Sequence, residues 1–474
     1  MPEKFDAQDA FKLVQLLAEE LETARRHLPL FIMDEDKKGL LDLIRAIRDL
    51  ALVMFNNLSR ILVVPDSPGF ITLEGYVPSD SILKLERDFG DHLVKIQPVS
   101  KRGTQDPYVP SLLVNSRVIS LFENLSLMKG VPKYNEIDPT PIIALVFPFF
   151  FGIMFGDVGH GIALLAFGIY LLRMTKYDYW GKLIVVFGSA ATAFGFLRGS
   201  FFGLEFASPI QRVVNLPEVF SAHFTLLFIP LLLEIAIIVG TFHLASAYAI
   251  GFANQIRSNE YIDAFLDRLP TFTLYCSIVP LGLAFVGSGF SIQDIFTSQA
   301  RTPIFYEVLG LYVPVSLTAI ISAIIVICSL TVLVIGRPIV RYMSARTRRV
   351  HKAVRSLASS AAEAITRPFE FFMNTISYAR LGVLLISTTL LGGLIAGFLS
   401  FGVIGTFLAV FSNIAVMSLE GIILYIQDMR LHLYEWMPKF YSGSGTAFTP
   451  FVKSGENFQL SFVFDQPEII EIKN

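Results

Sequence analysis

The chain has 474 residues, of which 53% are hydrophobic and 16% are charged, and its formal net charge is −2. Soluble proteins carry about 25% charged residues, so this composition predicts a polytopic membrane protein embedded in a lipid bilayer. A nearly neutral chain argues against nucleic acid as a partner. Cys276 and Cys328 both lie in apolar runs and predict neither a disulfide framework nor a metal site, and no cofactor is expected.

The N-terminal residues predict a helical segment outside the membrane. Residues 1–15 lack the basic start and apolar core of a cleavable signal, so insertion is expected to use internal helices. Residues 8–60 hold two apolar patterns of helical spacing, separated by Pro29 and a charged turn. This arrangement fits an antiparallel helical hairpin, and it fits an ordinary two-helix core equally well.

The next segment changes its periodicity. Residues 61–98 alternate as strand, turn, strand, helix and strand, which predicts a small α/β module. The more polar residues 99–140 predict a linker with one amphipathic helix near 111–128. We therefore expect a cytoplasmic N-terminal domain up to residue 140, a membrane domain at 141–440 and a cytoplasmic tail at 441–474.

The membrane domain is expected to start with a pair of helices. Residues 141–173 are apolar except at GDVGHG, residues 156–161. One helix of that length would measure about 50 Å at ~1.5 Å per residue, too long for a bilayer core of ~30 Å. We predict two close-packed spans joined by an exposed hairpin, whose backbone is bonded by Asp157 and His160 and whose structural residues are Gly156, Asp157, Gly159 and His160. The alternative, a phosphate loop, lacks its Lys-Ser/Thr ending.

Six further spans make eight in all and place both termini on one side of the membrane. The segment 336–367 carries eight Lys or Arg residues against Glu363 alone, which marks the cytoplasmic side. The opposite loops 204–222 and 290–310 contribute one arginine each, so both termini are expected in the cytoplasm. No inverted repeat relates the two halves, which argues against many secondary-transporter folds. The six spans are about 181–203, 223–252, 270–289, 311–335, 368–398 and 402–440, the last two long enough to require tilting.

Ionisable residues inside these spans are candidate functional sites, because a charge at the centre of a bilayer costs at least ~2.5 kcal/mol. Glu234 and His243 are nine positions apart, about 900° at ~100° per residue, and so face opposite sides of their helix. The ionisable residues of the earlier spans either bond to neighbouring helices or line a water path. They are Arg198, Glu205, Glu234 and His243.

Arg380 is the most constrained of these residues, because its guanidinium remains protonated. It lies between TISYA and LGVLLISTTLL, and no carboxylate lies within helical reach of it on its own span. We therefore expect its counter-charge to come from another helix or another protein. Its own span also carries a short polar stripe, formed by Ser377, Ser387 and Thr388, with Asn374 near the start.

The last span carries a longer polar stripe. Asn413, Glu420 and Gln427 recur every seven residues and share one helical face. Arg430 follows one turn later, about 15 Å along the helix axis from Glu420. The neighbours of Arg430 at this end of the helix are Asp428, His432, Glu435 and Lys439. In an alternative interpretation, the helix ends at the membrane interface and these side chains reach into the headgroup region.

Three motifs resemble the a (or I) subunit of the vacuolar and archaeal rotary ATPases. They are MFGDVGHG at 154–161, NTISYARL at 374–381 and LEGIILYIQDMRLHLYEWMPKFYSGSGTAFTPF at 419–451. FITLEGYVPSDSILKLE at 70–86 also looks like the cytoplasmic GWVP-type element of that family, and the resemblance covers roughly residues 60–455. It implies a stator beside a rotating proteolipid ring, with peripheral-stalk and central-stalk contacts made by the N-terminal domain.

The resemblance also implies roles for individual residues. Arg380 matches the family's essential arginine, which meets the ring carboxylate and keeps it ionised. Arg430 matches a second arginine, and Glu420 matches a carboxylate of the extracytoplasmic half-channel. The weaker half-channel candidates are Ser377, Ser387, Thr388, Asn413, Gln427, His432 and Glu435. The implied function is to couple proton or sodium flow through two half-channels to ring rotation, in the plasma membrane if the source is prokaryotic, with ATP chemistry on other subunits.

Two departures from the family pattern leave alternatives open. Thr388 stands where vacuolar members have a histidine, and the N-terminal domain is about half as long as is usual in the family. A stand-alone secondary ion transporter or channel, in which Arg380 binds a substrate anion, is the main alternative. A membrane scaffold with a cytoplasmic docking module is the third. The chain itself specifies neither the coupling ion nor the working direction.

Overall fold

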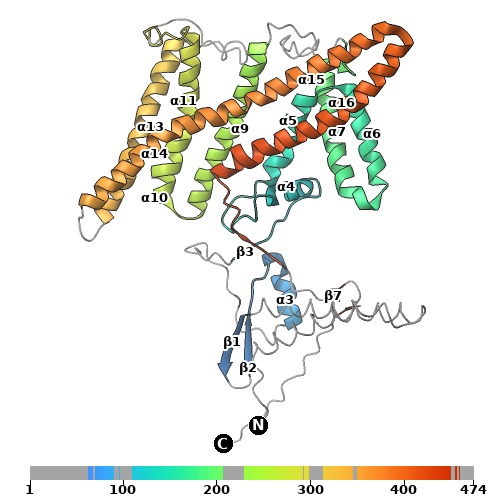
Figure 1. Cartoon of the computed structure of the whole chain (residues 1–474). Helices are drawn as coiled ribbons and strands as arrows, with labels where there is room; N and C mark the ends of the chain where they lie inside the picture. Colours follow the sequence, from blue (N-terminus) through green and yellow to red (C-terminus); the bar gives the residue numbers. More distant parts are fainter. Residues whose placement is uncertain are drawn as a thin grey trace, which may run out of the picture. The chain divides into compact units, whose positions relative to one another are not determined.

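The computed structural model describes residues 62–67, 70–89, 96, 109–206, 229–291, 293–297, 313–344, 350–449, 454–455 and 458–459. The chain divides into two compact units, Met1–Ile96 with Ala447–Asn474, and Gln97–Thr446. The described residues are mainly helical, as the composition predicts (Figure 1).

The first unit contains a β-hairpin followed by a helix. A bulge separates Pro65 from Ser67 in the antiparallel hairpin, at the residue that cannot donate to the ladder. The strand, turn, strand and helix predicted for 61–89 are therefore found. The predicted third strand of this module lies outside the described residues except at Ile96, and the helices of 8–60 lie outside them altogether. The elements are β1 (Leu62–Ser67), β2 (Phe70–Glu74), a 3₁₀ turn (Ser79–Ser81), α3 (Ile82–Phe89), β7 (Ser454–Gly455) and β8 (Phe458–Gln459).

The second unit starts with short elements and a three-helix layer. β3 (Pro110–Ser111), a 3₁₀ turn (Ile119–Phe122) and α4 (Glu123–Leu127) precede α5 (Thr140–Phe155), α6 (Val158–Leu172) and α7 (Asp178–Arg198). Small residues let α6 and α7 approach closely, since a Cβ on Gly161 would lie 2.4 Å from Thr192 Oγ1. The two short strands β4 (Ser200–Phe201) and β5 (Leu204–Glu205) form a hairpin after α7.

A second group of helices stands beside the first (Figure 1). It comprises α9 (Ile229–Arg257), α10 (Tyr261–Asp263), a π-helical turn (Ala264–Arg268), α11 (Leu269–Gly287) and α13 (Val315–Ser344). α14 (Val350–Ser377) and α15 (Ala379–Phe398) follow, with a break at Tyr378. α16 (Gly402–Arg430) continues as a π-helical turn (Leu431–Trp436) and a 3₁₀ turn (Met437–Lys439), and β6 covers Thr446–Ala447.

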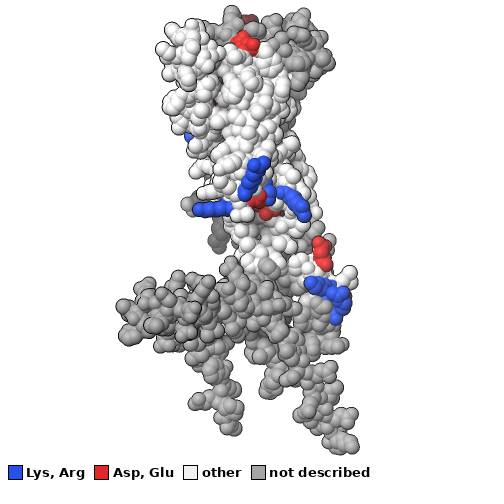
Figure 2. All heavy atoms as spheres, turned by 90° about the vertical axis from the view of Figure 1, so that its right-hand side faces the viewer, with Lys and Arg blue, Asp and Glu red and all other residues white. Residues whose placement is uncertain are grey.

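The last helices lie obliquely across the others. Figure 1 shows α14 and α15 running diagonally past the more upright α13, α11 and α9, and α16 running diagonally past α7 and α5. Five helical stretches of the described chain are long and apolar enough to cross a membrane, and two shorter apolar helices, α5 and α6, join them. Figure 2 shows a broad band of uncharged surface on one face, with charged side chains gathered below it. The protein is therefore membrane-integral, and the count of eight spans stays a prediction.

Two expectations about local structure are wrong. Most of the basic segment 336–367 is helical rather than a loop, because α13 extends to Ser344 and α14 starts at Val350. Arg, Lys and Ala are good helix formers, so the many basic residues of this segment are compatible with a helix. The helix expected near 111–128 is also much shorter, since only Ile119–Leu127 is helical.

The end of the last helix is held by the linker that precedes α5. Tyr441 donates a hydrogen bond to the Gly130 carbonyl at 2.6 Å, and Gly445 N–H donates to the Val131 carbonyl at 2.9 Å. Burial, together with the nearby Glu136 and Asp138, raises the pKa of Tyr441, so the hydroxyl remains a donor at physiological pH. These bonds fix the direction in which the chain leaves the membrane domain.

Candidate functional site

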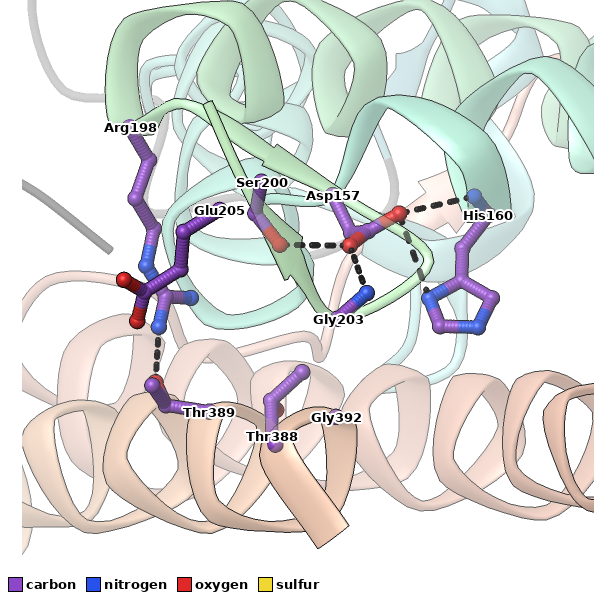
Figure 3. A pocket seen from close by; sticks show the side chains of 10 residues that line it. Asp157, His160, Arg198, Ser200, Gly203, Glu205, Thr388, Thr389 and Gly392 are labelled. Carbon is purple, nitrogen blue, oxygen red and sulfur yellow. Dashed lines mark hydrogen bonds and ion pairs between the residues drawn. The ribbon is translucent and has the colours of Figure 1, made fainter. Parts of the chain in front are cut away.

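Asp157 caps the start of α6 and is fully engaged in hydrogen bonds. Its Oδ1 accepts from the N–H groups of His160 at 3.0 Å and Phe202 at 2.9 Å. Its Oδ2 accepts from Ser200 Oγ at 2.6 Å and from Gly203 N–H at 3.0 Å (Figure 3). Because Asp157 and His160 are each only 3% exposed, the expectation of an exposed hairpin backbone is wrong. The carboxylate instead ties the β4–β5 hairpin to α6, inside the protein.

The GDVGHG segment also differs from the predicted hairpin in length. α5 ends at Phe155 and α6 begins at Val158, so Gly156 and Asp157 alone make the turn and His160 lies in the first helical turn. Gly159 packs against the ring of Phe202, where a Cβ would lie 2.4 Å from a ring carbon.

His160 connects α6 to the last helix. Its Nε2 lies 2.9 Å from Asn413 Oδ1, and the Asn413 amide donates to the Ala409 carbonyl at 2.9 Å. An Nε2–H donating to Asn413 leaves Nδ1 of a neutral His160 without a proton, 3.5 Å from Asp157. Asn413, predicted as a half-channel residue, is therefore bonded to a helix partner.

Glu420 lies where α5, α15 and α16 meet. It is 8% exposed, and its Oε1 accepts a hydrogen bond from Thr388 Oγ1 at 2.7 Å. The same hydroxyl lies 3.0 Å from the Met154 carbonyl and 2.9 Å from that of Leu384. Glu420 Oε2 is buried and has no hydrogen-bond partner among the described residues. Thr388 thus holds one carboxylate oxygen and leaves the other available.

A pocket opens beside these groups (Figure 3). Arg198, at the end of α7, donates to Thr389 Oγ1, and it is close enough to Asp157, Glu205 and Glu420 to attract their carboxylates. Arg198 is one of the ionisable residues that the sequence places in the earlier spans, and the structure puts it beside Thr389 in this pocket. The pocket is lined by Asp157, His160, Arg198, Ser200, Gly203, Glu205, Thr388, Thr389, Gly392 and Gly393.

Arg380 belongs to a different polar set. It follows the break at Tyr378, where the Tyr378 N–H donates to the Thr375 carbonyl at 3.1 Å. Arg380 Nη2 donates to Ser377 Oγ at 3.1 Å, and Ser377 Oγ donates to Glu435 Oε1 at 2.8 Å. Arg380 Nη1 is buried without a hydrogen-bond partner, and no ion pair joins this guanidinium to a carboxylate within the described chain.

Arg430 is close enough to Arg380 to repel it electrostatically, whereas Glu435 attracts it. Arg380 and Thr388 are separated by eight residues of α15, about 12 Å at ~1.5 Å per residue. The structure therefore places Glu420 with Thr388, and places Ser377, Arg380, Arg430 and Glu435 in a second group.

The remaining predicted residues fall outside these bonds. Ser387 is half-buried on α15 and joins neither hydrogen-bonded set. Gln427 Oε1 is buried and lacks a partner among the described residues. His432 is buried beside Asp428 and His243, away from the headgroup position that the interfacial alternative requires.

These observations define a class: a membrane-integral helical protein with carboxylates and guanidinium groups inside its helix bundle. Residues 54–179 match the V-type ATPase 116kDa subunit family. The A-type ATP synthase subunit I of Aeropyrum pernix is 26% identical over 394 residues, 76% of this chain and 54% of that protein. The subunit I of Pyrococcus abyssi is 28% identical over 369 residues, 74% of this chain and 49% of that protein.

The A-type ATP synthase subunit I of Saccharolobus solfataricus is 25% identical over 498 residues and covers 91% of this chain and 66% of that protein. The family match and these relatives confirm the resemblance to the a/I subunit of V-type and A-type rotary ATPases. The chain spans about half the length of the first two of these relatives.

Proposed function

We propose that this chain is the ion-translocating stator subunit of a rotary V/A-type ATPase or ATP synthase. In this role it provides two half-channels beside a proteolipid ring and couples proton or sodium flow to rotation of that ring. The similarity to A-type ATP synthase subunits I supports a rotary ATPase subunit. The observation that carries the finer proposal is the state of Arg380.

Arg380 is a fixed cation whose counter-charge is incomplete. Ser377 stands between its Nη2 and Glu435, and Nη1 is buried without a partner among the described residues. Arg380 is half-buried, and a buried guanidinium nitrogen without an acceptor is costly unless a carboxylate approaches it. A carboxylate on a moving neighbour meets this need and is released again when the next one arrives. Arg380 is therefore proposed to face the acidic group of the proteolipid ring.

Glu420 is proposed to carry ions in the extracytoplasmic half-channel. Its Oε2 is buried and unpartnered, and the pocket of Arg198 and Glu205 opens beside Thr388, which binds its Oε1. Arg380 lies about 12 Å further along α15, at ~1.5 Å per residue. A permanent cation at that point stops ions from passing directly between the half-channels, so each ion has to travel on the ring. Each elementary charge then delivers ~2.3 kcal/mol per 100 mV to rotation.

The proposed partners are the proteolipid ring, the lipid bilayer, and the peripheral and central stalks, which the N-terminal domain is expected to contact. Both termini are proposed to lie in the cytoplasm, at the plasma membrane if the source is prokaryotic. ATP binding and hydrolysis are assigned to other subunits of the complex.

Cross-linking tests the placement of Arg380. Val383 is 53% exposed one turn after Arg380, and Ile324 is 56% exposed on α13. In a background that carries Cys276→Ser and Cys328→Ser, we expect Val383→Cys to cross-link to the copurified proteolipid and the matched Ile324→Cys to remain free of it.

Two results contradict the proposal. One is purification of the intact chain without any small proteolipid that bears a buried Asp or Glu. The other is equal cross-linking from both cysteine positions. Ion transport by the isolated chain in vesicles, with an anion competing at Arg380, would support the stand-alone transporter instead.

A further inference from the structure

Asp428 is a buried carboxylate that the half-channel scheme does not use. It lies on α16 with 0% exposure, and neither of its carboxylate oxygens has a hydrogen-bond partner in the described part of the chain. Nδ1 of His432 lies 3.2 Å from Asp428 Oδ1 and 3.0 Å from the Asp428 carbonyl oxygen. An ionised carboxylate in such surroundings is costly, so an added proton is stabilised on Asp428 or on His432. Asp428 and His432 are therefore candidates for binding one proton.

A second buried histidine faces this pair. The imidazole rings of His432 and His243 have centroids 5.0 Å apart, and Nε2 of each ring lacks a partner among the described residues. His243 Nδ1 lies 2.9 Å from the Tyr378 hydroxyl. When Tyr378 donates to Nδ1, the proton of neutral His243 is on Nε2, while neutral His432 donates from Nδ1 to the Asp428 carbonyl oxygen and keeps Nε2 as an acceptor. Nε2 of His243 is then a hydrogen-bond donor, and Nε2 of His432 is an acceptor.

Aromatic side chains enclose these groups. Phe150 lies 5.2 Å from His243 and 5.7 Å from His432 between ring centroids, and Trp436 stacks on His243 at 5.0 Å. Phe147 lies 5.3 Å from His432. An enclosure of this kind excludes bulk water and makes an uncompensated charge costly. Proton exchange with neighbouring side chains is thus favoured over exchange with solvent.

Glu435 is the buried carboxylate nearest to the pair along the chain, and it is connected to Arg380 through Ser377. Asp428, His432 and Glu435 follow one another at intervals of four and three residues. The stretch includes the π-helical turn Leu431–Trp436, a distortion that is common at functional sites. Glu435 Oε2 is buried without a partner among the described residues, like His432 Nε2, and Oε1 accepts from Ser377, which also binds Arg380.

We propose that Asp428 and His432 form a proton-binding site inside the membrane domain that exchanges its proton with Glu435, beside Arg380. A proton arriving at His432 forms an N–H bond at Nε2, the Nδ1–H bond breaks, and that proton forms an O–H bond on Asp428. The pair changes from a charge of −1 to neutral, and the reverse sequence releases the proton to Glu435. This inference rests on the proposed function and adds a proton store to it, with His243 and Tyr378 as positioning residues.

The pH dependence of transport tests this site. The groups that face Asp428 are His432 and Tyr425 on its own helix, His243 of α9 and Tyr378 at the helix break. Asp428→Asn keeps the side-chain shape, removes the carboxylate and deprives His432 of its counter-charge, so proton capture weakens most at alkaline pH. In the complete complex reconstituted in vesicles, we expect ATP-driven proton uptake to fall at least about tenfold at alkaline pH and to change less than about twofold at acid pH.

Tyr378→Phe removes only the hydroxyl and should shift the pH profile in the same direction by a smaller amount. If the complex with Asp428→Asn does not assemble, the pH profile of Tyr378→Phe tests the proton-binding site in its place. Ser418→Ala, at an exposed position of the same helix, is the matched control. An infrared difference spectrum between acid and alkaline pH should also contain a protonated-carboxyl band that Asp428→Asn lacks.

A structural role alone would lower uptake equally at every pH, and that result overturns the inference, as does an unchanged profile. Arg380→Ala separates the two proposals. If Arg380→Ala stops transport while the Asp428 and Tyr378 variants keep the original pH profile, only the proton-binding site is wrong. If Arg380→Ala transports normally, the proposed function itself fails.

Discussion

Glu420 and Arg380 are ionisable groups on adjacent helices with very different surroundings. Glu420 has one oxygen bonded to Thr388 and one unbonded oxygen, so it can gain or lose a proton without breaking a contact. Arg380 cannot lose its proton and depends on a carboxylate for compensation. In the proposed mechanism, Glu420 carries an ion and Arg380 blocks its direct passage.

Glu420→Gln tests the first of these roles. The amide oxygen can still accept from Thr388, whereas the exchangeable proton is lost. Because a positioned proton-transfer group contributes about 100-fold or more to a rate, we expect ATP-driven uptake to fall by about that factor. Vesicle acidification measures the rate, and proteolipid copurification measures assembly. Detachment of the ring, rather than slow transport by an assembled complex, would count against a half-channel role.

The sequence predicted these residues better than it predicted their partners. A seven-residue period showed that Asn413, Glu420 and Gln427 share a helix face, because that depends on one helix alone. The contacts of Asn413 with His160 and of Glu420 with Thr388 depend on how the helices pack, which the period does not contain. The sequence marks Asp428 only as a neighbour of Arg430, whereas the structure buries it more deeply than Glu420 or Glu435.

At the scale of elements, the break between α14 and α15 sets the position of Arg380. The sequence predicts one continuous span at 368–398, and the helix is interrupted there at Tyr378 alone, whose backbone stays right-handed helical. Tertiary contacts hold Tyr378 at this point. Tyr378 is bonded to His243, and its ring packs against Gly240 of α9 so closely that a Cβ there would lie 2.2 Å from the ring. Such contacts between distant helices cannot be predicted from the local sequence.

Gly240→Ala should therefore displace Tyr378 and, through it, Arg380. Overpacking of this kind costs about 1–3 kcal/mol, so we expect a lower thermal unfolding temperature and slower ATP-driven transport. Gly282→Ala on α11 is the control, because no heavy atom lies within 4 Å of its added Cβ. The helix-propensity gain there should leave stability equal or higher by about 0.5–1 kcal/mol. Equal behaviour of the two variants would refute the role of this contact.

At the scale of the whole molecule, the helical unit arranges two polar sites along α15 and α16. The Glu420 site adjoins the pocket of Arg198 and Asp157, and Arg380 is connected through Ser377 to Glu435, which follows the Asp428–His432 pair along the chain. The composition predicted a mainly helical membrane protein, because burial in a bilayer requires few charges and backbone bonds made within each helix. The oblique course of α14, α15 and α16 results from packing among helices that local patterns do not encode.

The most direct measurement is ATP-driven ion uptake by complete complexes carrying Arg380→Ala, reconstituted into vesicles and assayed with and without sodium. The account predicts that the ring still copurifies, that uptake is lost, and that Arg380→Lys does not restore it, because an ammonium group does not reproduce the planar guanidinium. Uptake at the original rate in an assembled Arg380→Ala complex would contradict the account.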